Sequence, residues 1–319
     1  MIEVRNLTKV YGKTKAVDDL SFTVEDGEIF GFLGPNGAGK STTMNIMTGC
    51  LSSTEGTVVI EGHDIFEEPF EAKKCIGYLP EQPPLYLDMM VVEYLKFVAE
   101  AKKISKKDIP DELIRVMKKT GLLDVQNRLI KTLSKGYKQR VGIAQALLGN
   151  PKVVILDEPT VGLDPAQILE IRDLIRKLGK NHTVILSSHI LQEVNSVCDK
   201  IMIIAYGKLK VCAAPEELYK TYCSNRLLCL AARVSQEQMK AILEDFFGEK
   251  TYCEQDGITE AQIQFPEEIV YGDGTDVRDH IYKMMCERQI PLLEMYFKKP
   301  TLEQVFMELT QEREGGGEL

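Results

Sequence analysis

The strongest chemical signal in the sequence is a glycine-rich segment near the amino terminus. Residues 34–41 read Gly-Pro-Asn-Gly-Ala-Gly-Lys-Ser, which matches the pattern G-x-x-x-x-G-K-S/T. Glycines let backbone N–H groups turn inward around phosphates, and the dipole of a following helix adds to the attraction. We expect Lys40 to reach the outer phosphates and Ser41 to offer its hydroxyl to Mg²⁺. The residues predicted to contact phosphate are Gly34, Pro35, Asn36, Gly37, Ala38, Gly39, Lys40, Ser41 and Thr42.

Two carboxylates follow a short apolar run further along the chain. Residues 153–156 read Val-Val-Ile-Leu, and Asp157 and Glu158 come directly after them. This run predicts a buried strand, and a parallel sheet places its chemistry at the carboxyl ends of its strands. We expect Asp157 to hold Mg²⁺ through water and Glu158 to act as general base for an attacking water. An Asp-Glu pair alone would be equally typical of a solvated strand end and of a catalytic site. The loop at 34–41 favours the catalytic interpretation.

A third motif precedes the acidic strand, where residues 133–140 read Leu-Ser-Lys-Gly-Tyr-Lys-Gln-Arg. It resembles the LSGGQ signature of ABC ATPases, whose Ser and Gly cap the γ-phosphate of the nucleotide bound by the opposing subunit. The resemblance implies this role for Ser134 and Gly136. The motif departs from the common signature at Lys135 and Tyr137, and its LSKG form resembles bacterial exporter-like cassettes. Alone, Ser134 predicts only a capped helix.

Further markers of this family follow in the expected order. Tyr11 resembles the aromatic residue that stacks on adenine, and a tyrosine that serves only the turn is the less favoured alternative. Gly162-Leu163-Asp164 resembles the D-loop that crosses the dimer interface, which implies a nucleotide-site role for Asp164. His189 follows an expected strand at 183–186 and resembles the switch histidine that contacts the γ-phosphate and orients the attacking water. A lone histidine is more often structural, so its position after a strand is what favours catalysis.

One marker leaves two residues open. Residues 79–86 resemble the Q-loop, whose glutamine senses Mg²⁺ and the transmembrane partner. The family register, counted back from Leu85 and Tyr86, falls on Glu81, one residue before Gln82. We prefer Gln82 by residue type as the one that approaches the metal and keep Glu81 beside it.

The elements that must position these motifs are those of an α/β fold. Apolar and polar residues alternate over 2–24, which predicts short antiparallel strands, and a buried strand at 29–33 leads into the glycine-rich loop. The pattern at 88–148 is mostly helical, and strands and helices alternate over 153–204, which is typical of a mostly parallel sheet. With the resemblance, these features predict a P-loop ABC cassette with a mixed sheet core, an antiparallel β subdomain and a helical subdomain.

A smaller domain is expected after the cassette. Beyond residue 221 the pattern becomes strand-helix-strand-strand-helix-strand-helix, which predicts a small α+β accessory domain. Its final segment, 301–306, resembles the appendages of drug- and polymer-exporter cassettes. We therefore predict a cassette at 1–221, an accessory domain at 222–312 and a flexible tail at 313–319.

Composition narrows the setting in which the protein works. The 319 residues carry a net charge of −9, which argues against a nucleic-acid partner. The eight cysteines accompany no secretory signal and are expected to be reduced thiols. No run approaches the roughly 20 apolar residues that span a bilayer. We expect a cytoplasmic chain that would serve a membrane process only by docking on a partner.

The resemblance implies the ATP-hydrolysing subunit of an ABC transporter, with Lys40, Glu158 and His189 as catalytic residues and ATP and Mg²⁺ as ligands. Two cassettes, in a homodimer or a heterodimer, would enclose two ATP molecules, and a transmembrane permease subunit would bind them at the inner face of the membrane. Export is favoured, while the substrate is chosen by the permease. The alternative is a soluble ABC ATPase of translation or DNA repair. A P-loop kinase or GTPase would give no reason for Ser134 or His189.

Overall fold

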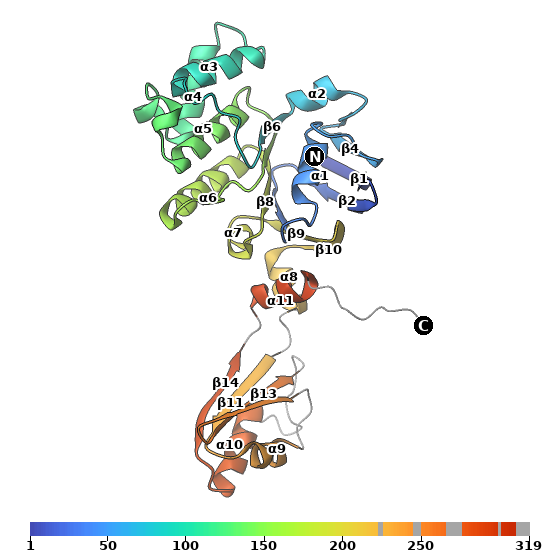
Figure 1. Ribbon diagram of the computed structural model, residues 1–319, viewed down its shortest axis with the longest axis vertical. Helices are drawn as coiled ribbons and strands as arrows, with labels where there is room; N and C mark the ends of the chain where they lie inside the picture. The colour runs from blue at the N-terminus through green and yellow to red at the C-terminus, as the bar shows by residue number, and fades with distance from the viewer. Residues whose placement is uncertain (223–225, 245–249, 266–275, 299–300, 311–319) are drawn as a thin grey trace. The chain divides into compact units, whose positions relative to one another are not determined.

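The computed structural model describes residues 1–222, 226–244, 250–265, 276–298 and 301–310. Its contacts divide the chain into two compact units, which are described separately (Figure 1). The first comprises Met1–Pro215 and, of the described residues, also Leu309 and Thr310; the second comprises Glu216–Glu308, so that the last two residues of α11 (Leu302–Thr310) group with the first unit. The domain limits expected from the sequence stay a prediction, and the expected tail, 313–319, lies outside the described residues. No helix in the described ranges has both the length and the apolar character that crossing a membrane requires.

A mixed sheet forms the centre of the first unit. Its neighbouring parallel strands are buried on both faces, which explains why their sequences are continuous apolar runs. The last strand pairs antiparallel with its neighbour and makes the sheet mixed, as predicted. In spatial order the strands are β10 (Lys208–Ala213), β9 (Lys200–Ala205), β3 (Ile29–Leu33), β8 (Thr183–Ser188), β7 (Val153–Leu156) and β6 (Ile76–Leu79).

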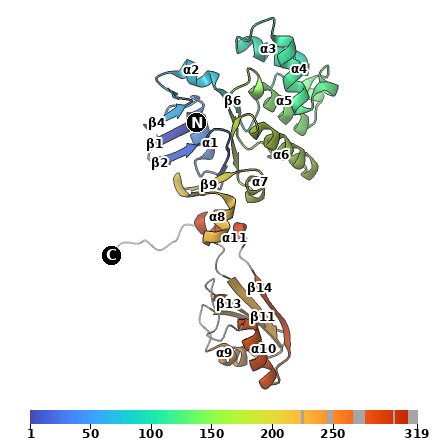
Figure 2. The same cartoon turned by 180° about the vertical axis from the view of Figure 1, so that it is seen from behind.

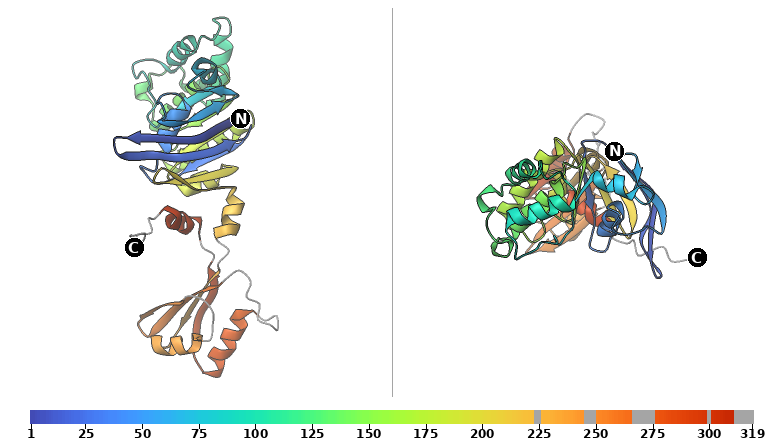
Figure 3. Two further views of the ribbon diagram at one scale, coloured as in Figure 1. Left: turned by 90° about the vertical axis from the view of Figure 1, so that its right-hand side faces the viewer. Right: turned by 90° about the horizontal axis from the view of Figure 1, so that it is seen from above.

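An antiparallel sheet packs beside this centre, also as predicted (Figure 3). Phe22 from β2 stacks on Phe30 and meets the edge of Phe32, both from β3, so the two sheets share one apolar core. Helix α1 (Lys40–Met47) contributes to the same core through Met44 and Met47. In spatial order the strands are β2 (Thr14–Val24), β1 (Ile2–Tyr11), β4 (Glu55–Ile60) and β5 (His63–Asp64).

The expected helical subdomain gathers beyond β6, on the side away from β1 and β2 (Figure 2). Lys102, directly after α3 (Val91–Ala101), links that helix to α5 (Lys135–Leu147). The ammonium of Lys102 donates to the carbonyl oxygens of Gln145, Ala146 and Leu148 at the end of α5. The remaining helices of this unit are α2 (Pro69–Lys74), α3 (Val91–Ala101), α4 (Ile109–Thr120), α5 (Lys135–Leu147), α6 (Pro165–Gly179) and α7 (Leu191–Asn195), with 3₁₀ turns η1 (Leu123–Val125) and η2 (Ile130–Thr132).

The second unit has the order of elements that the sequence predicts. A four-stranded antiparallel sheet, ordered β12-β13-β11-β14, carries α9 and α10 on one face, which is the ferredoxin-like topology (Figure 3). Leu230, Ile263 and Ile281 lie in its core. The expected continuation of α9 to residue 247 lies outside the described residues. The elements are α8 (Pro215–Tyr222), β11 (Arg226–Ala232), α9 (Gln236–Leu243), β12 (Lys250–Gln255), β13 (Ile258–Phe265), α10 (Val277–Glu287), β14 (Leu292–Lys298) and α11 (Leu302–Thr310).

Candidate functional site

A cavity of about 360 Å³ lies where β3, β7 and β8 of the central sheet end. Segments that are far apart in the sequence meet around it, because parallel strands direct their carboxyl ends to one edge of the sheet. The lining residues are Ala16, Asn36, Gly37, Ala38, Gly39, Lys40, Ser41, Thr42, Glu81, Glu158, Val161 and His189.

The glycine-rich loop is packed too tightly for side chains at two of its glycines. Gly39 precedes α1 with φ at +104°, and a Cβ there would overlap the carbonyl oxygen of Ala16. A Cβ on Gly34 would overlap the carbonyl oxygen of Ile204. The loop is therefore clamped between β2 and β9, with the first turn of α1 opening on the cavity.

Lys40 follows the last glycine of this loop as the first residue of α1, and it is almost fully buried. Its ammonium donates to the carbonyl oxygens of Gly34 at 2.7 Å and Pro35 at 3.3 Å, and it lies 3.4 Å from Glu158 Oε1. These contacts hold a positive charge at the floor of the cavity, where phosphate oxygens would be attracted to it.

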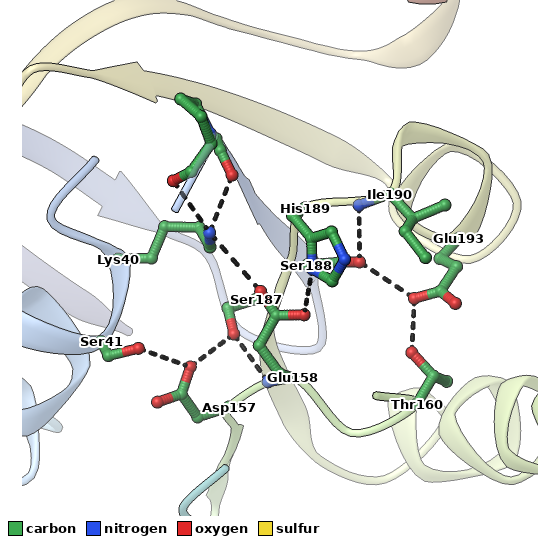
Figure 4. Close-up of polar contacts among 12 residues, drawn as sticks. Lys40, Ser41, Asp157, Glu158, Thr160, Ser187, Ser188, His189, Ile190 and Glu193 are labelled. Atoms are coloured by element: carbon green, nitrogen blue, oxygen red, sulfur yellow. Dashed lines mark hydrogen bonds and ion pairs between the residues drawn. The ribbon is translucent and has the colours of Figure 1, made fainter. Parts of the chain in front are cut away.

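Asp157 lies below the cavity with 2% of its surface exposed. Its Oδ1 accepts hydrogen bonds from Ser187 at 2.6 Å and from Ser41 at 3.3 Å (Figure 4). Burial nevertheless raises the pKa of Asp157 above its ordinary value, and the two hydroxyl bonds offset only part of that rise.

Ser41 and Asp157 fit a divalent cation, because a hydroxyl and a buried carboxylate lie within one coordination sphere of each other. A cation would also relieve the cost of the buried charge on Asp157. Among the described residues, no cluster of three His, Cys, Asp or Glu side chains could hold a metal alone. Phosphate and water would have to complete the coordination, which is typical of Mg²⁺.

Glu158 is held in an unusual backbone conformation between the side chains of Lys40 and His189. Its φ is +48°, a left-handed value that is costly for a residue with a Cβ. Its backbone N–H donates to Ser187 Oγ at 2.7 Å, which secures the turn after β7. Its carboxylate lies between Lys40 and the Nδ1 of His189, 2.9 Å away (Figure 4).

Glu81 reaches the cavity, whereas Gln82, the residue preferred from the sequence, is not among the lining residues. Both side chains are exposed, so burial does not distinguish the two residues, and only their contribution to the cavity lining does. Within the 79–86 loop, Glu81 is the residue that lines the cavity.

Gly34, Pro35 and Asp157 lie behind the lining residues, and the remaining predicted residues that do not line this cavity lie elsewhere on the cassette. Tyr11 is half exposed at the end of β1. Ser134 caps α5 by accepting from the N–H of Tyr137, Gly136 is buried against Gln167, and Asp164 caps α6 by accepting from the N–H of Gln167 at 2.9 Å. The nucleotide-site roles that the resemblance implies for these four residues stay predictions.

The sequence analysis missed four polar residues behind the site: Thr160, Ser187, Ser188 and Glu193. It ended the strand at residue 186, but β8 continues to Ser188 and places Ser187 beside Asp157. Ser188 and Thr160 both donate to the carboxylate of Glu193. Two serines directly before a histidine, at the end of a buried strand, were the available signal.

The chain is similar in sequence and in fold to known proteins. The ABC transporter family model matches residues 17–161. The chain is 46% identical over 212 residues to the ABC transporter ATP-binding protein YhcH of Bacillus subtilis, covering 66% of this chain and 68% of that protein. It is 35% identical to the bacitracin transport ATP-binding protein BcrA of Bacillus licheniformis, covering 99% and 98%. A solved dimeric cassette, in a post-hydrolysis state with ADP and Pi, aligns with a TM-score of 0.61 and 26% identity, over 67% of this chain and 99% of that one.

Proposed function

Since the chain belongs to the family of ABC transporter ATP-binding subunits, we propose that its ATP hydrolysis powers export through a separate membrane-spanning subunit. The observation that carries the proposal is the convergence of Lys40, Glu158 and His189 on one cavity behind a phosphate-binding loop. This arrangement supplies a cationic phosphate site, a base and an orienting group, which are the parts that phosphoryl transfer to water requires.

Each side chain has a defined task in this reaction. The loop N–H groups and Lys40 bind the β- and γ-phosphates. Glu158 accepts a proton from the water that attacks the γ-phosphorus, as the bond to ADP breaks. His189 holds the carboxylate in place through Nδ1 and directs its exposed ring edge toward the γ-phosphate. Mg²⁺, held by Ser41 and Asp157 with Glu81 nearby, would neutralise charge on the phosphate oxygens.

The second half of each site is supplied by another cassette. Ser134 opens α5 with an exposed helix N-terminus, which suits an anion, yet neither it nor Gly136 lines the cavity of its own chain. This supports a head-to-tail pair of cassettes with two ATP molecules between them. The second cassette is either another copy of this chain or a related one.

The relative named for bacitracin transport aligns with this chain over almost its whole length, including the second unit. This supports export of a bound substrate through a permease at the inner face of the membrane. It disfavours a soluble ATPase of translation or DNA repair, because such a protein would have no reason to share the entire chain with a transport subunit.

The test is to isolate the full chain from membranes of the cells that produce it and to identify what accompanies it. We expect a membrane-spanning subunit to co-purify, with ATP hydrolysis by the complex. Recovery with ribosomal particles or DNA, and without a spanning protein, would contradict the transport role.

A further inference from the structure

We propose that Glu193 is a positioning residue that holds the segment carrying Glu158 and the segment carrying His189 at a fixed separation. The inference rests on the ATPase function proposed above and assigns a task to a residue that does not line the cavity.

One carboxylate oxygen makes both connections. Oε2 of Glu193 accepts a hydrogen bond from Thr160 Oγ1 and another from Ser188 Oγ at 2.9 Å (Figure 4). Thr160 lies two residues after Glu158, and Ser188 lies directly before His189. The carboxylate therefore bridges the two segments on the side away from the cavity.

The connection to His189 is reinforced on its other side. The backbone N–H of Ile190 donates to Ser188 Oγ at 3.0 Å, so one hydroxyl bonds both Glu193 and the residue after His189. The backbone on either side of the histidine is thus fixed to one point. This constrains the position from which His189 Nδ1 reaches Glu158.

The helix that carries Glu193 is itself firmly seated. A Cβ on Gly31, in the middle of β3, would overlap Val194, so α7 packs directly on the backbone of the strand that leads into the phosphate loop. Glu193 therefore holds both segments in place relative to β3, the strand that leads into the glycine-rich loop and Lys40.

Burial of this carboxylate argues for a geometric task. Glu193 is 4% exposed, and in the described part of the chain no Lys, Arg or His forms a salt bridge with it. A buried carboxylate held by hydroxyls is costly, and an apolar side chain would fill the space at lower cost. An apolar side chain would not join Thr160 to Ser188.

The experiment compares Glu193→Ala, Glu193→Gln and Thr160→Val in the full chain, with Glu71→Ala, at an exposed site on α2, as control. We expect Glu193→Ala to lower kcat about tenfold or more while KM for ATP stays within about twofold, because small displacements of catalytic groups slow the chemistry. Glu193→Gln keeps an acceptor oxygen and should retain most of kcat, and Thr160→Val should lose part of it.

Provided that the wild-type protein hydrolyses ATP, two results overturn the inference. One is a kcat of Glu193→Ala within about twofold of wild type. The other is an equal loss of kcat in Glu193→Gln and Glu193→Ala. If Glu193→Ala does not fold, Thr160→Val and Ser188→Ala carry the test, each expected to lower kcat at unchanged KM. Absence of hydrolysis in the wild-type complex would instead overturn the proposed function itself.

Discussion

Nδ1 of His189 lies 2.9 Å from Oε2 of Glu158, across the gap between the ends of two neighbouring parallel strands. The other carboxylate oxygen of Glu158 lies 3.4 Å from the ammonium of Lys40. Both oxygens are thus held by cationic or polar groups from other segments. If Glu158 is the base, as proposed, its carboxylate is oriented in advance, which would lower the reorganisation that catalysis requires.

Glu158→Gln is expected to retain ATP binding and to lose hydrolysis by a factor of roughly 10² to 10⁴, because the amide no longer accepts a proton. With ATP present, size-exclusion chromatography should then show a trapped dimer. Glu71→Gln, at an exposed site, is the control. A normal rate of hydrolysis in Glu158→Gln would exclude Glu158 as the base.

Glu81→Ala is expected to raise the Mg²⁺ concentration required for half-maximal hydrolysis by severalfold, because Glu81 lines the cavity. Gln82→Ala should leave this concentration within about twofold of wild type. Titration of hydrolysis with Mg²⁺ separates the two residues. The reverse result would assign the loop's metal contact to Gln82.

Asp157→Asn should stabilise the protein in the absence of nucleotide and metal. Burial raises the pKa of Asp157 in the folded state, so the folded protein holds that proton more tightly than the unfolded chain. Above the raised pKa, the ionised carboxylate lowers the free energy of unfolding. As the pH falls through the raised pKa toward the ordinary value of 3.8, the carboxyl group of Asp157 takes up its proton and this destabilisation disappears.

Denaturant unfolding at several pH values checks this prediction. The stability gain of Asp157→Asn should be largest near neutral pH and should vanish in acid, while Asp173→Asn, on an exposed helix face, should show no such trend. Hydrolysis should nevertheless fall at least tenfold, because the amide is a poor Mg²⁺ ligand. A variant less stable than wild type at neutral pH would be evidence against the sign of the effect.

Gly207→Ala is expected to be more destabilising than Gly62→Ala. Both glycines have positive φ, +74° and +85°, so both substitutions carry a backbone cost of about 1–2 kcal/mol. At Gly207 the new Cβ would also lie 2.8 Å from the carbonyl oxygen of Ala16, whereas nothing lies within 4 Å at Gly62. Because Gly207 N–H donates to Ala38 in the phosphate loop, ATP affinity should fall too.

Thermal denaturation and ATP titration of both variants give the answer. Equal losses of stability, with unchanged ATP affinity in Gly207→Ala, would mean that the contact with Ala16 does not matter.

Local patterns predicted most of the fold. Burial on two faces makes β3 and β7 continuous apolar runs, and the alternation of β11 to β14 with α9 and α10 is visible in the periodicity. The glycine-rich loop and the acidic strand end were identified because their chemistry requires specific residues at fixed spacing.

The parts that were missed depend on contacts between distant segments. Its place in a Ser-Ser-His run at a strand end is the only local signal for Ser187, and its hydrogen bond to Asp157 appears only when β8 lies beside β7. The choice between Glu81 and Gln82 stayed open in the sequence for a related reason. The loop at 79–86 has no periodicity, so a one-residue shift in direction leaves no trace in the sequence.

The order of strands in the central sheet has a consequence for how the protein is made. β3 lies between β8 and β9, and its partners, such as Val184 for Ile29, emerge from the ribosome about 150 residues later. At roughly 5–20 residues per second, the phosphate loop spends on the order of ten seconds outside the ribosome before its flanking strands exist. We therefore expect the nucleotide site to form only after residue 205 has emerged, with the apolar β3 lacking both of its neighbouring strands until β8 and β9 are made.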